Sequence, residues 1–558
     1  MEDRMEPVAK SVVVISHARD MDFTRDYVSL PREYGSPSYD KREDVKAIKA
    51  VVRENLEKLD AKIHFTEKLR DRKVLIKPNL VTVFHDLGMQ KRDYPESTDP
   101  RVIDAVIEFL QQFTTSITIV ESSGRGMPTQ ASFHISGLDR LAKHRKVDLI
   151  ALEEQPTDRY LLPRARVMRE IVIPRVFSEV VKGEAFYISI PKMKTNLYTG
   201  VTLGFKNAMG TIAYNLRQRN HNHAINQKLV DMLHLFKADL VIIDGIVGGE
   251  GNCPAPVDPV QSRVIISGNQ SVETDRVATR MMGFDPETIP LMRIAAAEGF
   301  NDPNVEVIGE QTVTPYRPAD PSLLGGWMKE NFPNVRVLIG HSKTGAPVLD
   351  QCRVCDEQQL SALENVCRGG CLATTRYAFD MLYYEGKKRD FKLTLILGAG
   401  VKNNGSVLYY DGYGKPYSVA DIAALEGKKV AIGTCASPLK EIVDNHVDGC
   451  MPFPNSPHMV IHQMSGTMCS VISLRNRYLL PALFATLRAC ERRKALLRSG
   501  QRIDIALRHE DKVYKTREFT EEEMNQPYIY EPFDPLTPSE IKKLCAAENR
   551  SILATFFP

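Results

Sequence analysis

The sequence predicts an α/β protein with a mainly parallel β-sheet flanked by helices, followed by a second, smaller α/β domain that contains cysteines and by a helical C-terminal tail. Three observations predict this fold class. Short apolar runs rich in β-branched residues alternate with segments of helical periodicity, the same alternation restarts near residue 335, and the composition becomes charged and helical after residue 476. Continuous apolar strands that alternate with helices are typical of a sheet buried on both faces.

The first domain is predicted to span residues 1–300. Its helical segments include 99–113, where apolar residues recur at helical spacing, and 272–284, which follows the last strand. Ligands of such sheets collect at the loops that leave the carboxyl ends of the strands, so functional residues are expected there. The strand-like runs lie at 73–81, 117–124, 185–192, 238–246 and 263–268.

A second domain is predicted after a connection that is rich in proline and weakly periodic. Strand-like runs restart with VRVLIG at 335–340 and continue with LTLILGAG at 393–400 and KVAIGTC at 429–435. The sequence therefore predicts four parts: an α/β domain with a lysine-lined anion cleft, a linker, a cysteine-rich α/β metal-binding domain and a charged helical extension. They span residues 1–300, 301–334, 335–475 and 476–558.

Composition and charge argue against several classes of protein. The 558 residues exceed one ordinary domain, and 73 lysines and arginines against 70 aspartates and glutamates leave no strong field for nucleic acid. The N-terminus is acidic where a secretory signal is basic, and no apolar run approaches the roughly 18 residues of a spanning helix. We therefore expect a cytoplasmic protein with reduced cysteines and without nucleic-acid or membrane partners.

Lysines gather at the predicted strand ends. In IPKMKTNLYTGVTLGFKNAMG (190–210), Lys192 and Lys194 are two residues apart and so point to the same face of a strand. Lysine is a mobile charge suited to phosphate or carboxylate, and asparagine adds a directional donor and acceptor. The alternative is that each lysine is a strand-end residue that reaches solvent. We favour a cleft that binds a small anionic substrate, lined by Lys77, Asn79, Lys192, Lys194, Lys206 and Asn207.

The segment DGIVGGEGNCPAP (244–256) is predicted to face these lysines. Asp244 leaves a buried strand and joins the substrate-binding set, while glycine turns let the backbone approach a ligand closely. Glu250 is a candidate acid, base or metal ligand, with a solvated loop glutamate as the alternative. Cys253 is a candidate nucleophile or ligand. The predicted catalytic residues are therefore Glu250, Cys253 and Lys206.

Four cysteines lie close together in QCRVCDEQQLSALENVCRGGC: Cys352, Cys355, Cys367 and Cys371. A CxxC pair places two thiolates on one turn, and a second pair after a spacer can close a metal site. Sulfur ligation suits zinc and iron–sulfur clusters equally, so the spacing leaves the metal open. Cys435 and Cys450 form a further pair that holds a separate cluster, completes the first one, acts in redox exchange, or is buried and inert.

Several of these segments together resemble the domain-of-unknown-function family 362. They are IKPN, STDPRVIDAVI, IPKMKT, GFKNAMG, DGIVGGEGN and TDRVATRMMGF, in that order, and the resemblance covers about residues 70–285. The later GTC and DGCMPFP segments also look like a pattern of that family, although Met451 separates Cys450 from Pro452. Members of the family often carry cysteine-rich iron–sulfur segments. The resemblance therefore implies an iron–sulfur cluster, of the [4Fe–4S] type, at the cysteine quartet.

Three functions are open from the sequence. The first is a cytoplasmic iron–sulfur oxidoreductase that acts on the small anionic substrate and exchanges electrons with an electron-transfer protein. The second is a transferase or ligase for a phosphorylated or carboxylated substrate, with zinc stabilising the second domain. The third is a non-catalytic metal or cluster carrier. A homodimer through the charged C-terminal helix is the default expectation for the assembly.

Overall fold

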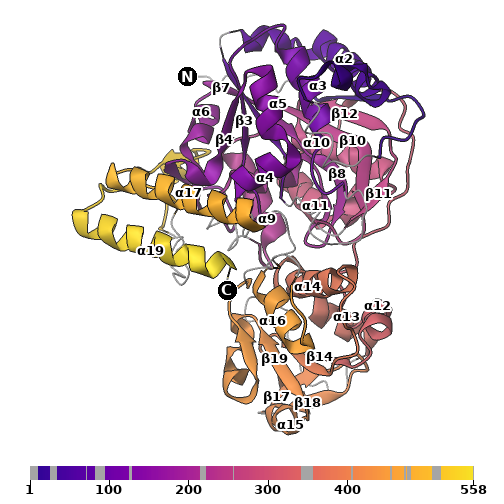
Figure 1. Ribbon diagram of the computed structural model, residues 1–558, viewed down its shortest axis with the longest axis vertical. Helices are drawn as coiled ribbons and strands as arrows, with labels where there is room; N and C mark the ends of the chain where they lie inside the picture. The colour runs from indigo at the N-terminus through magenta and orange to yellow at the C-terminus, as the bar shows by residue number, and fades with distance from the viewer. Residues whose placement is uncertain are drawn as a thin grey trace.

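The computed structural model of the protein has two lobes, each built around its own sheet, and a C-terminal segment that lies beside the first lobe (Figure 1). The residues that the structure describes are 10–24, 34–70, 72–81, 95–124, 128–213, 221–254, 257–340, 356–403, 406–452, 455–469, 473, 479–504 and 517–556.

The first lobe contains a mainly parallel sheet, as the sequence predicts. Its strands lie in the order β13 (Glu306–Ile308), β1 (Val12–His17), β12 (Val264–Gly268), β10 (Leu240–Glu250), β7 (Ala185–Ile190), β2 (Lys73–Pro78), β3 (Ile117–Glu121) and β4 (Asp148–Ala151). Strand β12 runs antiparallel to both neighbours, and the other neighbouring pairs are parallel. Strands β8 (Lys192–Asn196) and β11 (Asp258–Val260) also pair with β10, and β9 (Gly200–Thr202) pairs with β8. Strand β13, an edge strand, lies inside the stretch that the sequence assigned to a linker.

Helices cover both faces of this sheet. Val74 and Ile76 of β2 belong to the core under α2 and α3, whereas Leu75 belongs to the opposite core with α10 and α11. Helix α3 starts where the sequence predicts, because the Asp99 carboxylate accepts a hydrogen bond from the Arg101 amide at 2.9 Å. The helices of this lobe are α1 (Pro37–Lys41), α2 (Glu43–Ile63), α3 (Pro100–Leu110), α4 (Thr129–Ser136), α5 (Leu138–Arg145), α6 (Ser178–Val181), α7 (Gly204–Asn207), α9 (Ile225–Asp231), α10 (Ser271–Met281) and α11 (Pro290–Ala297).

The second lobe has its own smaller sheet. Its strands lie in the order β16 (Val401–Asn403), β17 (Ser406–Tyr410), β14 (Val335–Ile339), β15 (Leu393–Leu397), β19 (Lys428–Ile432) and β20 (Asn445–Val447), and β18 (Pro416–Ser418) pairs with β17. The four strands from β14 to β20 are parallel. Its helices are α12 (Gly326–Asn331), α13 (Glu357–Asn365), α14 (Ala373–Tyr384), α15 (Val419–Ala424) and α16 (Asn455–Ser465).

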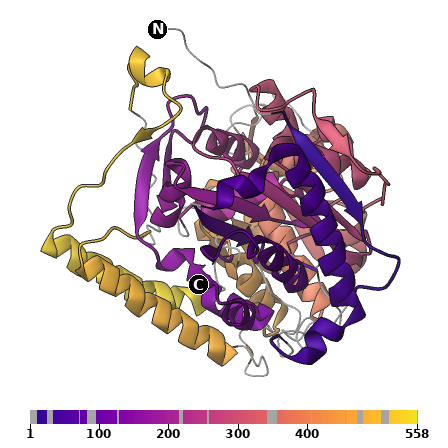
Figure 2. The same cartoon turned by 90° about the horizontal axis from the view of Figure 1, so that it is seen from above.

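The C-terminal segment returns to the first lobe. Helices α17 (Leu479–Arg498) and α19 (Pro538–Phe556) pack against each other, as Figure 2 shows, and α18 (Glu521–Met524) lies between them in the chain. Strand β21 (Ile529–Tyr530) extends a small sheet with β5 (Thr157–Leu161) and β6 (Glu170–Pro174) of the first lobe. These features confirm the predicted fold class. Across the described stretches of chain, no helix has the length and apolar character that a membrane crossing requires.

Candidate functional site

Three of the predicted lysines lie in one buried polar network at the carboxyl-terminal edge of the first sheet. Lys77 of β2, and Lys192 and Lys194 of β8, are each 1% exposed. The Lys77 ammonium lies 2.8 Å from the Glu121 carboxylate at the end of β3. It also donates to the Asn207 side-chain oxygen at 3.1 Å. The structure thus joins Lys77 and Asn207, which are far apart in sequence.

Lys192 pairs with Asp244, which lies within β10. Its ammonium lies 2.8 Å from Asp244 Oδ2, and both side chains are 0% exposed. Asp244 Oδ2 also accepts a hydrogen bond from the Asp99 amide at 2.7 Å. This carboxylate therefore ties strand β10 to strand β8 and to the start of α3. Its role in substrate binding stays a prediction.

Lys194 has neutral hydrogen-bond acceptors. Its ammonium donates to Asn79 Oδ1 at 3.0 Å and to the Glu96 backbone carbonyl oxygen. Burial lowers the pKa of Lys194 from 10.5 to about 8, although the nearby Cys253 and Glu96 oppose this shift. Lys194 is therefore a buried amine that can gain or lose a proton close to neutral pH.

The free energy of unfolding of the wild-type protein is expected to increase as the pH rises from about 8 to 10.5, and replacing Lys194 with methionine is expected to abolish this increase. Because the folded-state pKa is depressed, the folded protein releases this proton at a lower pH than the unfolded chain does. The cost of burying the ammonium is present in full below pH 8 and disappears as the pH rises to 10.5. The measurement is the difference in the free energy of unfolding in urea between wild type and K194M, taken at several pH values across this range. A difference that is independent of pH contradicts the prediction.

Lys206 and Asn207 lie in the short helix α7, where they are buried. The Asp275 carboxylate holds the start of this helix, because it accepts from the Gly204 amide at 2.8 Å and the Phe205 amide at 2.7 Å. A side chain at position 204 would place its Cβ 2.5 Å from Val241 Cγ1, so the close approach of α7 to the sheet requires glycine. Asn207 then reaches Ser189 Oγ at 2.9 Å.

The two other predicted catalytic residues lie in different environments. Glu250 ends β10, and its Oε2 accepts a hydrogen bond from the Arg317 amide at 2.7 Å. Cys253 is fully buried, with Sγ 3.6 Å from Thr195 Oγ1, and burial raises its pKa to about 12. Cys253 is thus a thiol at neutral pH. The proposed catalytic roles of Glu250, Cys253 and Lys206 stay predictions.

Cysteines from three turns come together where the two lobes meet. The Cys371 sulfur lies 2.7 Å from the position that a Cβ on Gly433 would occupy, so the turn before Cys435 passes directly over Cys371. This turn is bonded to the turn that carries Cys450, since the Thr434 amide donates to the Gly449 carbonyl at 3.2 Å. Cys352 and Cys355 lie outside the described residues.

The pKa of Cys371 reflects the presence of the other cysteines. The Cys367 side chain, burial and the nearby Cys450 and Cys435 raise the pKa of Cys371. The hydrogen bond from Cys371 in turn lowers the pKa of Cys367 to about 7, and the His223 backbone adds to this effect. The thiols of Cys367, Cys435 and Cys450 thus all act on the pKa of Cys371, and we call these four residues the thiol group. Thiolates gathered in this way are the ligands that zinc and iron–sulfur clusters use.

The thiol group and the lysine network are connected through a short stretch of chain. The Leu197 amide, three residues after Lys194, donates to the Cys253 carbonyl at 2.9 Å. The Leu197 carbonyl accepts from the Arg368 guanidinium at 3.3 Å, next to Cys367. Loops of the first lobe therefore reach from the buried lysines to the cysteine turns of the second.

Sequence reasoning missed residues in both lobes. It did not identify Glu121 as the partner of Lys77, because the two lie on different strands. It assigned no signal to Cys469, and it did not consider His458 and His462, which the structure groups with Cys469 and Glu385. The spacing His-x₃-His followed by a cysteine is the local signal that was available.

The fold and these residues describe an α/β protein with a buried lysine–carboxylate network next to gathered thiols. The family model described as "Domain of unknown function (DUF362)" matches residues 74–280, which confirms the resemblance inferred from the sequence. The match contains Lys77, the lysines of β8 and the segment 244–256. The chain is also 29% identical over 126 residues to the Thylakoid-associated protein sll1697 of Synechocystis sp.. That alignment covers 22% of this chain and 39% of the relative.

Proposed function

We propose that the protein is an iron–sulfur oxidoreductase that acts on a small anionic substrate. The observation that carries this proposal is the position of Cys371, which lies against the turn before Cys435 and whose pKa is raised by Cys367, Cys435 and Cys450. Four cysteine thiolates are the ligand set of a [4Fe–4S] cluster. The resemblance to the matched family implies the same choice of metal, although the family model itself names no metal. Cys352 and Cys355 are proposed as further ligands on sequence grounds alone.

The lysine network supports an anionic substrate. Lys77 and Lys192 have carboxylate partners, so their charges are balanced inside the protein. Lys194 has neutral acceptors and carries its charge in a buried setting, where an added anion is attracted strongly. Its lowered pKa, about 8, suits it to supply a proton to a substrate that receives electrons. A cluster held by the thiol group would supply those electrons, with a reduced electron-transfer protein as the electron donor.

Anaerobic purification of the full chain tests this proposal. The expected protein is brown, contains about four iron and four sulfide ions, and loses visible absorption when dithionite reduces it. Colourless protein with zinc in place of iron contradicts the proposal and favours the zinc-stabilised transferase or ligase. Rapid transfer of the iron to an apo-acceptor protein favours the carrier.

We also propose the cytoplasm as the compartment. No disulfide joins the cysteines in the described part of the chain, as expected in a reducing compartment. The name of the Synechocystis relative associates that protein with thylakoids. Cell fractionation followed by detection with an antibody to this chain tests whether the protein is found in the cytoplasm or with membranes.

A further inference from the structure

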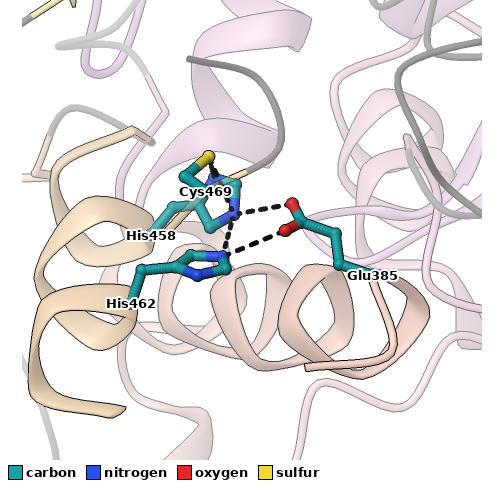
Figure 3. A group of neighbouring side chains, drawn as sticks. All are labelled: Glu385, His458, His462 and Cys469. Atoms are coloured by element: carbon teal, nitrogen blue, oxygen red, sulfur yellow. Dashed lines mark hydrogen bonds and ion pairs between the residues drawn. The ribbon is translucent and has the colours of Figure 1, made fainter. Parts of the chain in front are cut away.

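Four side chains converge inside the second lobe, as Figure 3 shows: Glu385, His458, His462 and Cys469. The proposed function gives none of them a role. Glu385 directly follows α14. The two histidines lie one turn apart on α16, so both face the same side of that helix. Cys469 follows the end of α16 by four residues. The group therefore connects the end of α14 with α16 and with the segment that follows α16.

The distances between the polar atoms suit a metal ion. His458 Nε2 lies 3.0 Å from His462 Nε2 and 3.7 Å from Cys469 Sγ. Each carboxylate oxygen of Glu385 lies 3.5 Å from one of these Nε2 atoms. A tetrahedral zinc ion with bonds of about 2.0–2.3 Å holds its ligand atoms about 3.3–3.6 Å apart. These pairs are thus near the spacing that zinc imposes, and all four ligand atoms lie within 4.8 Å of one another.

The group is buried, so any unbalanced charge within it would be costly. The side chain of Glu385 is 0% exposed, and His458, His462 and Cys469 are 1–2% exposed. A carboxylate and a thiolate in such a place need compensating positive charge. One Zn²⁺ ion with these two anions and two neutral imidazoles gives a net charge of zero.

An outer hydrogen bond orients one of the imidazoles. His462 Nδ1 lies 2.8 Å from Thr467 Oγ1, which in turn lies 2.8 Å from Ser465 Oγ. When Nδ1 donates its proton to Thr467, the lone pair of Nε2 points into the group. Metal-binding histidines are usually held by such a partner on the second nitrogen.

We propose that Glu385, His458, His462 and Cys469 bind one zinc ion with a structural role. Four protein ligands fill a tetrahedral zinc ion and leave no open position, which is typical of structural sites. Mixed nitrogen, sulfur and oxygen ligands favour zinc over calcium or magnesium. The ion fastens the end of α14 to α16 and to the chain that leads toward α17. This site is separate from the thiol group and does not depend on the proposed function.

Zinc analysis of the full chain tests this site, with zinc and iron measured separately. The expected wild-type protein holds about one zinc per chain at this site, and Cys469→Ala and His462→Gln each reduce that zinc to less than about one tenth. Cys469→His keeps a ligand atom and is expected to keep the zinc. The matched controls, Cys545→Ser on α19 and the exposed His134→Gln on α4, are expected to retain it.

Thermal unfolding provides the second measurement. Because zinc binds the folded state, added Zn²⁺ is expected to raise the Tm of metal-depleted wild type but not that of Cys469→Ala. Wild type that holds no zinc and shows no rise in Tm overturns the proposal, and it does so even where a variant fails to fold. Zinc that is retained in both Cys469→Ala and His462→Gln also overturns it, because that zinc belongs to another site.

Discussion

Lys192→Met is expected to lower the free energy of unfolding of the first lobe by about 3–5 kcal/mol. The substitution leaves the Asp244 carboxylate without the ammonium that lies 2.8 Å away, in a place where both side chains are 0% exposed. The penalty is large because the remaining charge has no access to water. Typical domains have only about 5–15 kcal/mol of stability in total, so the variant unfolds at a much lower urea concentration.

Two signals separate the lobes in this experiment. Far-UV circular dichroism reports the whole chain, whereas Trp327, the single tryptophan, lies in α12 of the second lobe. The matched control is Lys73→Met, because Lys73 pairs with Glu179 at 3.1 Å with side chains that are 32% and 36% exposed. This control is expected to cost about 1 kcal/mol or less. Equal effects of the two variants contradict a buried ion pair at Lys192.

The double variant Lys192→Met with Asp244→Asn tests the physical reason. Once the carboxylate is also neutralised, no uncompensated charge remains in the core. The double variant is therefore expected to be more stable than the sum of the single losses predicts. Strictly additive losses indicate that the two side chains do not interact.

The fold was predictable because its signals are local. Apolar β-branched runs identified β2, β3, β7 and β10, and the sequence around Asp99 and Pro100 gave the start of α3. Side-chain alternation also placed Lys192 and Lys194 on one face. The ion-pair partners of the buried lysines were not predictable in the same way, since they depend on which strands become neighbours. Glu121, the partner of Lys77, comes from β3, and nothing near residue 77 in the sequence indicates it. The segment that begins with Asp244 was predicted to face the lysines, but its direct pairing with Lys192 was not predicted.

The second lobe shows the same limit for the cysteines and histidines. A CxxC pair drew attention to residues 352–371, whereas the structure brings Cys371 near Cys435 and Cys450, more than 60 residues further along. Glu385 lies more than 70 residues before His458, so its place beside the two histidines depends on how α14 and α16 pack. Spacing predicts a metal site only when the ligands share one segment of chain.

Cys371→Ser is expected to remove most of the iron from anaerobically purified protein. The three other thiols of the thiol group all raise the pKa of Cys371, so we expect Cys371 to be one of the ligands. A serine hydroxyl is a poor substitute for thiolate at a cluster. The measurements are iron and sulfide content and visible absorption. Cys490→Ser serves as the control, because Cys490 is buried in α17, outside the thiol group.

A panel of single variants then identifies the ligands. A [4Fe–4S] cluster takes four thiolates, and the chain offers six candidates. Cys435→Ser and Cys450→Ser are expected to lose iron as Cys371→Ser does, because their turns meet at Gly433 and Gly449. The double variant at Cys352 and Cys355 decides between two ligand sets. Retained iron assigns the cluster to the thiol group, whereas lost iron with Cys435→Ser and Cys450→Ser intact assigns it to the CxxC quartet.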